Sequence, residues 1–171
     1  MSDKPNARTI LTANQQTLND LWEEHVRDEF ATRDTEATLR TMVPDAYVNH
    51  VPVMTGGYGH GALREFYSRR FIPQMPPDTE MIPVSRTIGT DRVVDEMIFR
   101  FTHTLEMDWL LPGVPPTGKR VEIPLVAVVH FAKESWRTNI FTGTKLPCWC
   151  NSGFSARTDC RWREWRSRAK F

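Results

Sequence analysis

The hydrophobic pattern changes period once along the chain, from a helical repeat to strand-like alternation near residue 79. Before this point, apolar residues recur at steps of three and four in three segments. After it, apolar and polar residues alternate over 79–88, 92–105 and 119–131, as is typical of half-buried strands. Helices followed by long strands predict an α+β fold, in which a meandering antiparallel sheet curls over the helices and encloses a pocket.

The three helical segments have recognisable ends. Thr12 and Gln15 have the spacing of a capping box, and the apolar stripe that follows predicts a helix of about twenty residues. A second, short helix is expected to begin at Asp34 and to stop at Pro44, because proline disfavours helical backbone in the residue before it. The third helix should end before Pro73.

The strand predicted over 92–105 carries polar groups on its more apolar face, which we expect to point inward. That face holds Val93, Asp95, Met97, Phe99, Phe101 and His103. Asp95 and His103 therefore enter the core, whereas Glu96 and Arg100 face outward. A buried carboxylate or imidazole is costly unless paired, and burial shifts its pKa toward the range useful for proton transfer. Asp95 and His103 are candidate catalytic residues, unless they only satisfy backbone groups or each other.

Three further histidines differ in their setting. His50 lies on the first short strand beside Asn49, and we predict it as a third catalytic candidate; the alternative is a hydrogen-bonded structural histidine. His25 lies close to the buried stripe of the first helix, where it reaches the pocket or caps its edge. His60 falls in the glycine-rich stretch 56–61, a predicted flexible turn, and should be exposed to solvent.

Aromatic residues are the candidate walls of the pocket. The substrate-binding candidates are Trp22, Tyr47, Phe99, Phe101 and Trp109. Most aromatic residues at these spacings are ordinary core, which is the alternative for each. Trp109 differs because the loop over 108–118 is placed to close the mouth of the pocket.

Composition changes sharply near residue 132. Through residue 131 the chain has 13 Lys and Arg, 18 Asp and Glu, and no cysteine, whereas residues 132–171 contain all three cysteines and four of the six tryptophans. The formal charge goes from −5 in the first part to +6 in the second. The length and apolar content suit one core. We therefore predict a domain over 1–131 and a basic tail over 132–171.

A one-base shift of the reading frame makes the tail more protein-like. With synonymous codons chosen freely, the bases that encode it also encode His-Glu-His-Ile-Tyr-Trp-Asp, which has the character of a strand. We therefore hypothesise a single-base deletion near codon 132, and we expect the tail to be irregular or poorly packed. The alternative is a basic, aromatic tail that binds nucleic acid or a membrane. Because out-of-frame reading of GC-rich DNA produces Arg and Trp without selection, we expect neither partner.

Several other functions lack support in the sequence. Cys148-Trp149-Cys150 has neither zinc-like spacing nor a second ligand pair, so no metal site is expected. The chain has no nucleophile elbow and no lysine-containing phosphate loop, which argues against covalent hydrolases and nucleotide enzymes. It also has no signal-like apolar stretch and no run of about 18 apolar residues, so we expect a cytosolic protein.

Four segments carry a resemblance to a known family, namely 21–25, 47–52, 94–97 and 108–113. They resemble the SnoaL-like branch of the NTF2-like superfamily, the cone-shaped domains that include polyketide cyclases and ketosteroid isomerases. The resemblance implies an acid–base enzyme that acts on a small, mostly apolar carbonyl compound by cyclisation, isomerisation or dehydration. It implies no cofactor, and a homodimer formed through the sheet.

In such a mechanism a buried carboxylate or histidine removes a proton next to a carbonyl, and a second polar group steadies the enolate oxygen. We expect His50, Asp95 and His103 in these roles. The resemblance places the usual acid–base aspartate on the last strand, in the shifted-frame sequence, where this chain has Ile140–Thr144 instead. It therefore implies an impaired enzyme. The alternative is a noncatalytic ligand-binding or dimerisation module, which an apolar cavity with Asp95 and His103 both paired would favour.

Overall fold

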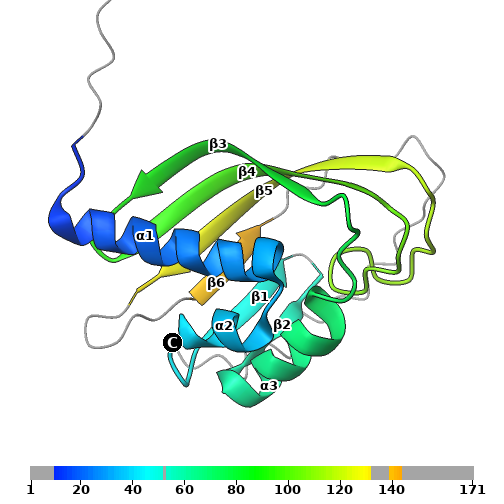
Figure 1. The fold of residues 1–171 in the computed structure, drawn as a ribbon, viewed down its shortest axis with the longest axis horizontal. Helices are drawn as coiled ribbons and strands as arrows, with labels where there is room; N and C mark the ends of the chain where they lie inside the picture. Colours follow the sequence, from blue (N-terminus) through cyan, green and yellow to red (C-terminus); the bar gives the residue numbers. More distant parts are fainter. Residues whose placement is uncertain (1–9, 52, 132–138, 144–171) are drawn as a thin grey trace, which may run out of the picture.

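The computed structural model describes residues 10–51, 53–131 and 139–143, which form helices packed on one face of a six-stranded sheet (Figure 1). In chain order, the elements are α1 (Ala13–Arg27), the π-helical turn η1 (Asp28–Thr32), α2 (Thr35–Arg40), β1 (Tyr47–Val51), β2 (Thr55–Tyr58), α3 (Gly59–Phe66), the π-helical turn η2 (Tyr67–Phe71), β3 (Glu80–Ile88), β4 (Arg92–Thr102), β5 (Arg120–His130) and β6 (Asn139–Gly143). The α+β fold predicted from the change of period is confirmed.

The helices begin where the sequence predicts. Thr12 caps α1 and forms the capping box with Gln15, in which each residue bonds to the other's backbone. The Asp34 carboxylate caps α2 by accepting hydrogen bonds from two backbone N–H groups. α1 lies across the sheet on the side of β3 and β4, whereas α3 packs beside β1 and β2 (Figure 1).

The glycine-rich stretch is more ordered than predicted. Residues 55–58 form β2, which pairs with β1, and α3 begins at Gly59. Gly56 has φ +138°, and a Cβ atom there would lie 2.0 Å from the carbonyl oxygen of Val48. This glycine therefore permits a close approach of two strands and does not mark a flexible turn.

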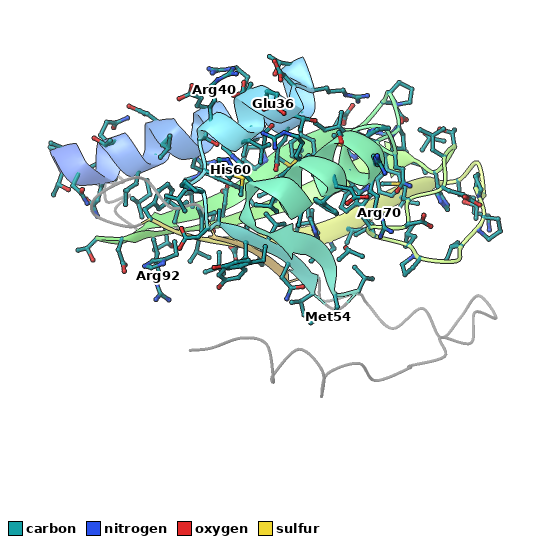
Figure 2. The ribbon with its side chains drawn as sticks, turned by 90° about the horizontal axis from the view of Figure 1, so that it is seen from below. Glu36, Arg40, Met54, His60, Arg70 and Arg92 are labelled. Atoms are coloured by element: carbon teal, nitrogen blue, oxygen red, sulfur yellow. The ribbon has the colours of Figure 1, made fainter. Side chains whose placement is uncertain are left out.

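The prediction that His60 faces solvent is wrong. The ring is half-buried in the first turn of α3, and its Nε2 lies 3.1 Å from the carbonyl oxygen of Met42. In Figure 2, His60 lies inside the layer of helices, whereas Glu36 and Arg40 lie at its outer edge. His60 therefore joins α3 to the end of α2.

The sheet has the order β2-β1-β6-β5-β4-β3, and among the described strands each neighbouring pair is antiparallel except β1 and β6. β3, β4 and β5 match the three predicted strands. β4 ends three residues early, at Thr102, because the chain turns there into the loop over 103–119. The inward face of β4 is buried as predicted, and Glu96 on the other face is exposed.

Five residues of the tail complete this sheet. β6 lies between β1 and β5 and pairs with both, parallel to β1 and antiparallel to β5. The remaining tail, and the predicted irregularity of its packing, lie outside the described residues. Among the helices that the structure describes, none is long and apolar enough to cross a membrane.

Candidate functional site

A small cavity lies between the helical layer and the sheet. Its walls come from α1, η1, η2, the loop over 103–119 and the inner faces of β1, β3, β4 and β5. Its volume is about 40 Å³, which is room for very few water molecules. Most lining side chains are apolar; apart from two indole N–H groups, the polar ones among the described residues are Glu29, His50 and Tyr67.

The carboxylate in this cavity comes from η1. Glu29 is 5% exposed, and its Oε1 lies 3.0 Å from Nε2 of the fully buried His25. The His25 ring stacks on Trp22, with centroids 5.5 Å apart. Leu18, Trp22, His25 and Glu29 follow one another at steps of four, three and four, so Glu29 lies on the buried face of the helix. Glu29 is not among the candidates predicted from the sequence, although its spacing from Leu18, Trp22 and His25 indicates a buried position.

His50 lines the cavity from β1, as predicted for a site residue. Its Nδ1 lies 3.2 Å from the carbonyl oxygen of Thr55, so Nδ1 carries the proton and Nε2 is a free acceptor in the neutral ring. Burial lowers the pKa of His50 to about 4, although the charge of Glu29 acts in the opposite direction. The imidazole is therefore uncharged at neutral pH.

Two buried donors lie on the cavity wall. The Tyr67 hydroxyl and the Trp109 Nε1 make no hydrogen bond of standard geometry with the described residues. Burial, then the adjacent charge of Glu29 and hydrogen bonding to its carboxylate, raise the pKa of Tyr67 well above its usual value, so the hydroxyl keeps its proton. The geometry of this contact with Glu29 falls short of a standard hydrogen bond. Such donors suit an oxygen atom of a bound molecule, because an unmet buried donor is costly.

Asp95 is buried as predicted but does not line the cavity. Its Oδ2 accepts hydrogen bonds from Trp22 Nε1 at 2.7 Å and from Arg86 Nη2 at 2.6 Å. Arg86 also donates to Asn19 and Glu23 on α1. The Asp95 carboxylate on β4 therefore joins α1 to β3 and β4. The alternative predicted from the sequence was that Asp95 bonds to backbone groups or to His103, whereas its partners are side chains of α1 and β3.

His103 also lies away from the cavity. It follows the last residue of β4, is 1% exposed, and has its Nδ1 3.3 Å from the Thr117 hydroxyl. Burial lowers its pKa. The three catalytic candidates are therefore not brought together: His50 lines the cavity, whereas Asp95 and His103 lie elsewhere in the core.

Three of the five predicted aromatic wall residues line the cavity. They are Trp22, Phe99 and Trp109. Phe101 packs behind Phe99 with ring centroids 5.2 Å apart, and Tyr47 is half-buried at the start of β1. Trp109 is 2% exposed, and its carbonyl accepts a hydrogen bond from Thr55 at 2.6 Å. It is thus a fixed part of the wall and not part of a loop over an open mouth.

A surface hollow lies beside the cavity. Val26, Phe30 and Met81 line both spaces, and Glu23 and Arg27 lie in the outer one. The three apolar side chains are therefore the partition between the cavity and the protein surface. Among the described residues, no group of three or more His, Cys, Asp and Glu is placed to hold a metal ion.

Comparison with known proteins gives a match over most of the chain. The family model described as SnoaL-like domain matches residues 22–138. No curated protein matches.

Three solved structures with the same fold are informative. A putative SnoaL-like polyketide cyclase from Jannaschia sp. is 21% identical, with TM-score 0.56 over 85% of this chain and 92% of that one. The epoxide hydrolase/cyclase-like enzyme SalBIII, of pyran ring formation in salinomycin, is 17% identical, with TM-score 0.59 over 77% and 93%. A hypothetical protein with a ketosteroid isomerase-like fold from Catenulispora acidiphila, in complex with trimethylamine, is 12% identical, with TM-score 0.55 over 74% of this chain and 86% of that one.

Proposed function

Because this chain belongs to the SnoaL-like domain family, we propose that it is an acid–base enzyme acting on a small, mostly apolar carbonyl compound. The reaction would be a cyclisation, an isomerisation or a dehydration, and it needs no cofactor. One observation carries the proposal: an otherwise apolar cavity contains the buried Glu29 carboxylate, the neutral His50 ring and the buried Tyr67 hydroxyl. These are the groups that moving a proton next to a carbonyl requires.

Each polar group has a distinct task in the proposal. Glu29 removes a proton from the carbon next to the carbonyl. The Tyr67 hydroxyl donates a hydrogen bond to the carbonyl oxygen as negative charge develops there, in a cavity where low polarity strengthens the bond. Nε2 of His50 accepts a hydrogen bond from the ligand and thereby fixes its orientation. Positioned acid–base groups contribute about 10²- to 10⁴-fold to such rates.

The sequence-based roles of Asp95 and His103 stay predictions. We give proton transfer to Glu29 because neither of those side chains lines the cavity. The resemblance puts the family's acid–base aspartate on the last strand, and residues 139–143 contain no aspartate. We therefore propose that the activity is weaker than that of a relative that has this aspartate. Among the described residues that line the cavity, Glu29 supplies the carboxylate.

The ligand must be small and must move side chains to enter. The cavity of about 40 Å³ is far below the roughly 300–1,000 Å³ of most ligand sites. We propose that Phe30 and Met81, in the partition next to the surface hollow, move aside to admit it. A homodimer formed through the sheet also stays a prediction.

A noncatalytic ligand-binding module is the second candidate. It is favoured by the pairing of Asp95 with Arg86 and Trp22, which removes from proton transfer a carboxylate that the sequence predicted to be catalytic. The fold also occurs in a protein solved with trimethylamine, so small-molecule binding on this fold does not require a carbonyl.

Deuterium exchange separates the two candidates. The protein is incubated in D₂O with a panel of small cyclic ketones, and loss of the proton signals next to the carbonyl is followed by NMR. Binding of the same compounds is followed by tryptophan fluorescence. We expect exchange faster than in buffer for at least one compound that binds. Binding without faster exchange across the panel would favour the noncatalytic module.

A further inference from the structure

The hydrogen bonds around His25 fix which of its nitrogens carries a proton. The Thr41 hydroxyl donates to the carbonyl oxygen of Thr38 at 2.7 Å. Its oxygen lies 2.6 Å from His25 Nδ1, and its one hydrogen is already directed to Thr38. The oxygen must therefore accept, so Nδ1 of His25 is a donor and carries a proton.

On the opposite side of the ring, Nε2 faces the Glu29 carboxylate, and this contact requires one further proton. Nε2 of His25 lies 3.0 Å from Oε1 of Glu29, with the two side chains 0% and 6% exposed. A neutral ring protonated at Nδ1 has a lone pair at Nε2, and an ionised carboxylate also presents a lone pair. Two buried acceptors facing each other at this distance are unfavourable, because both side chains are shielded from bulk solvent.

We propose that His25 and Glu29 share one proton between Nε2 and Oε1, so that the pair carries no net charge. The proton lies on nitrogen, as an imidazolium and a carboxylate, or on oxygen, as a neutral ring and a carboxylic acid. Apart from His25, the polar groups that act on Glu29 within the part of the chain that the structure describes are the Tyr67 hydroxyl from η2, which hydrogen-bonds to it, and the His50 ring from β1. Both of these are neutral, so neither supplies the missing charge.

The shared proton explains how Glu29 serves the proposed reaction, and this step rests on the proposed function. A neutral pair admits an uncharged, apolar ligand without leaving a bare charge in the cavity. When Glu29 takes a proton from the ligand, the C–H bond breaks and its electron pair forms the C=C bond of the enolate. The π electron pair of the C=O bond moves onto the carbonyl oxygen, and a new O–H bond forms on Glu29. The shared proton stays on His25. The pair is then cationic beside an anionic enolate, and the two charges attract each other.

His25 is in this account a positioning residue. It does not touch the ligand, because it does not line the cavity. The His25 ring is held by its hydrogen bond to Thr41 and by stacking on Trp22. The fixed ring in turn sets the orientation of the Glu29 carboxylate that bonds to its Nε2. Second partners of this kind orient a reacting carboxylate and tune its basicity.

NMR of the ring nitrogens tests the shared proton on the full chain without any ligand. The protein is labelled with ¹⁵N-histidine, and the five histidines are assigned from single His→Gln variants. If His25→Gln does not fold, the other four histidines are assigned from the variants His50→Gln, His60→Gln, His103→Gln and His130→Gln. The remaining signals then belong to His25. We expect Nδ1 of His25 to have the shift and the attached proton of a protonated nitrogen at pH 7.

The rival arrangement gives a different spectrum. In it Thr41 turns to donate to Nδ1, the ring carries its proton at Nε2, and the pair has a charge of −1. An unprotonated Nδ1 in the wild-type protein would overturn the proposal. Thr41→Ser keeps the hydroxyl and should keep the signal, whereas Thr41→Val should lose it or shift it.

An activity measurement distinguishes failure of this inference from failure of the proposed function. If the wild-type protein shows no ketone exchange, the function fails while the NMR result stands on its own. If exchange occurs, His25→Gln should lower kcat about tenfold or more with little change in KM, since the ligand still contacts Glu29. An unchanged kcat together with an unprotonated Nδ1 would remove His25 from the account.

Discussion

At the scale of single residues, two buried groups in one cavity behave differently because their partners differ. His50 bonds to a backbone carbonyl, which leaves burial to dominate, and its pKa falls to about 4. Glu29 bonds instead to His25, a side chain that can carry a proton for it. A neutral acceptor and a proton-exchanging group therefore lie side by side in an apolar space.

The lowered pKa of His50 predicts how stability depends on pH. The unfolded chain takes up a proton near pH 6.5, whereas the folded protein does so only near pH 4. Stability from the neutral ring is therefore complete above pH 6.5 and is lost as the pH falls toward 4, by on the order of 3 kcal/mol. Urea unfolding at pH 7 and pH 4.5 measures this loss.

A variant without the titrating ring isolates the effect. Carboxylates also titrate in this range, so the comparison is between the wild-type protein and His50→Asn under the same conditions. The variant should be less stable at pH 7 and should lose less stability on acidification. Equal losses in the two proteins would contradict a buried, neutral His50.

The residues that sequence could and could not identify differ in how local their partners are. The alternation of apolar and polar residues along β4 was enough to place Asp95 and His103 in the core, because which face of a strand is buried can be inferred from that strand alone. The partner of Asp95, Arg86, comes from β3, and no local pattern reveals that pairing. Glu29 was passed over because a charged residue on a helix usually faces water, although its spacing from His25 put it inside.

At the scale of elements, the β1–β2 hairpin positions His50. His50 pairs with Thr55 across the hairpin, and Asn49 pairs with Gly56. The Thr55 side chain then bonds the carbonyl of Trp109, so the hairpin also holds the loop that contributes to the cavity wall. From the sequence, the glycines of 56–61 predicted a flexible turn. The need for glycine at position 56 comes from the close approach of Val48, which is visible only once the two strands are paired.

Substituting Gly56 should damage this hairpin. In Gly56→Ala the new Cβ would lie 2.0 Å from the carbonyl oxygen of Val48, at a φ of +138° that side chains rarely adopt. We expect a loss of at least about 2 kcal/mol in the free energy of unfolding, together with weaker ligand binding because His50 moves. Urea unfolding followed by tryptophan fluorescence provides the measurement.

Gly61 is the matched control. It lies in α3, and a Cβ there would meet nothing within 4 Å. Gly61→Ala should therefore be neutral or should stabilise the protein by about 0.5–1 kcal/mol, since alanine favours helix. If both variants lose stability equally, the close approach at Gly56 is not the cause.

At the scale of the whole molecule, the change of hydrophobic period was sufficient to predict the class of fold, but not its closure. Strand positions follow from alternation along one segment, whereas the parallel pairing of β1 with β6 joins segments about ninety residues apart. The tail contributes β6 to the sheet, so the reading frame after codon 132 determines the sequence of a strand that pairs with both β1 and β5.

The deletion hypothesis predicts that one added base near codon 132 improves the protein. The restored chain would carry His-Glu-His-Ile-Tyr-Trp-Asp in place of the present last strand. We expect it to be more stable and to exchange ketone protons about 10²-fold faster or more, because the additional aspartate enters the site. Resequencing codons 128–136 and comparing the two expressed chains are the measurements. A restored chain that fails to fold would contradict the hypothesis.

The rate of deuterium exchange in Glu29→Gln tests the central claim most directly. Its control is Glu24→Gln, which changes a half-exposed carboxylate on α1, the helix that η1 continues. With the ketone that the wild-type protein exchanges fastest, we predict a loss of about 10²-fold or more in Glu29→Gln and no change in Glu24→Gln. Exchange that is equally fast in wild type and Glu29→Gln would show that this carboxylate does not carry the proton.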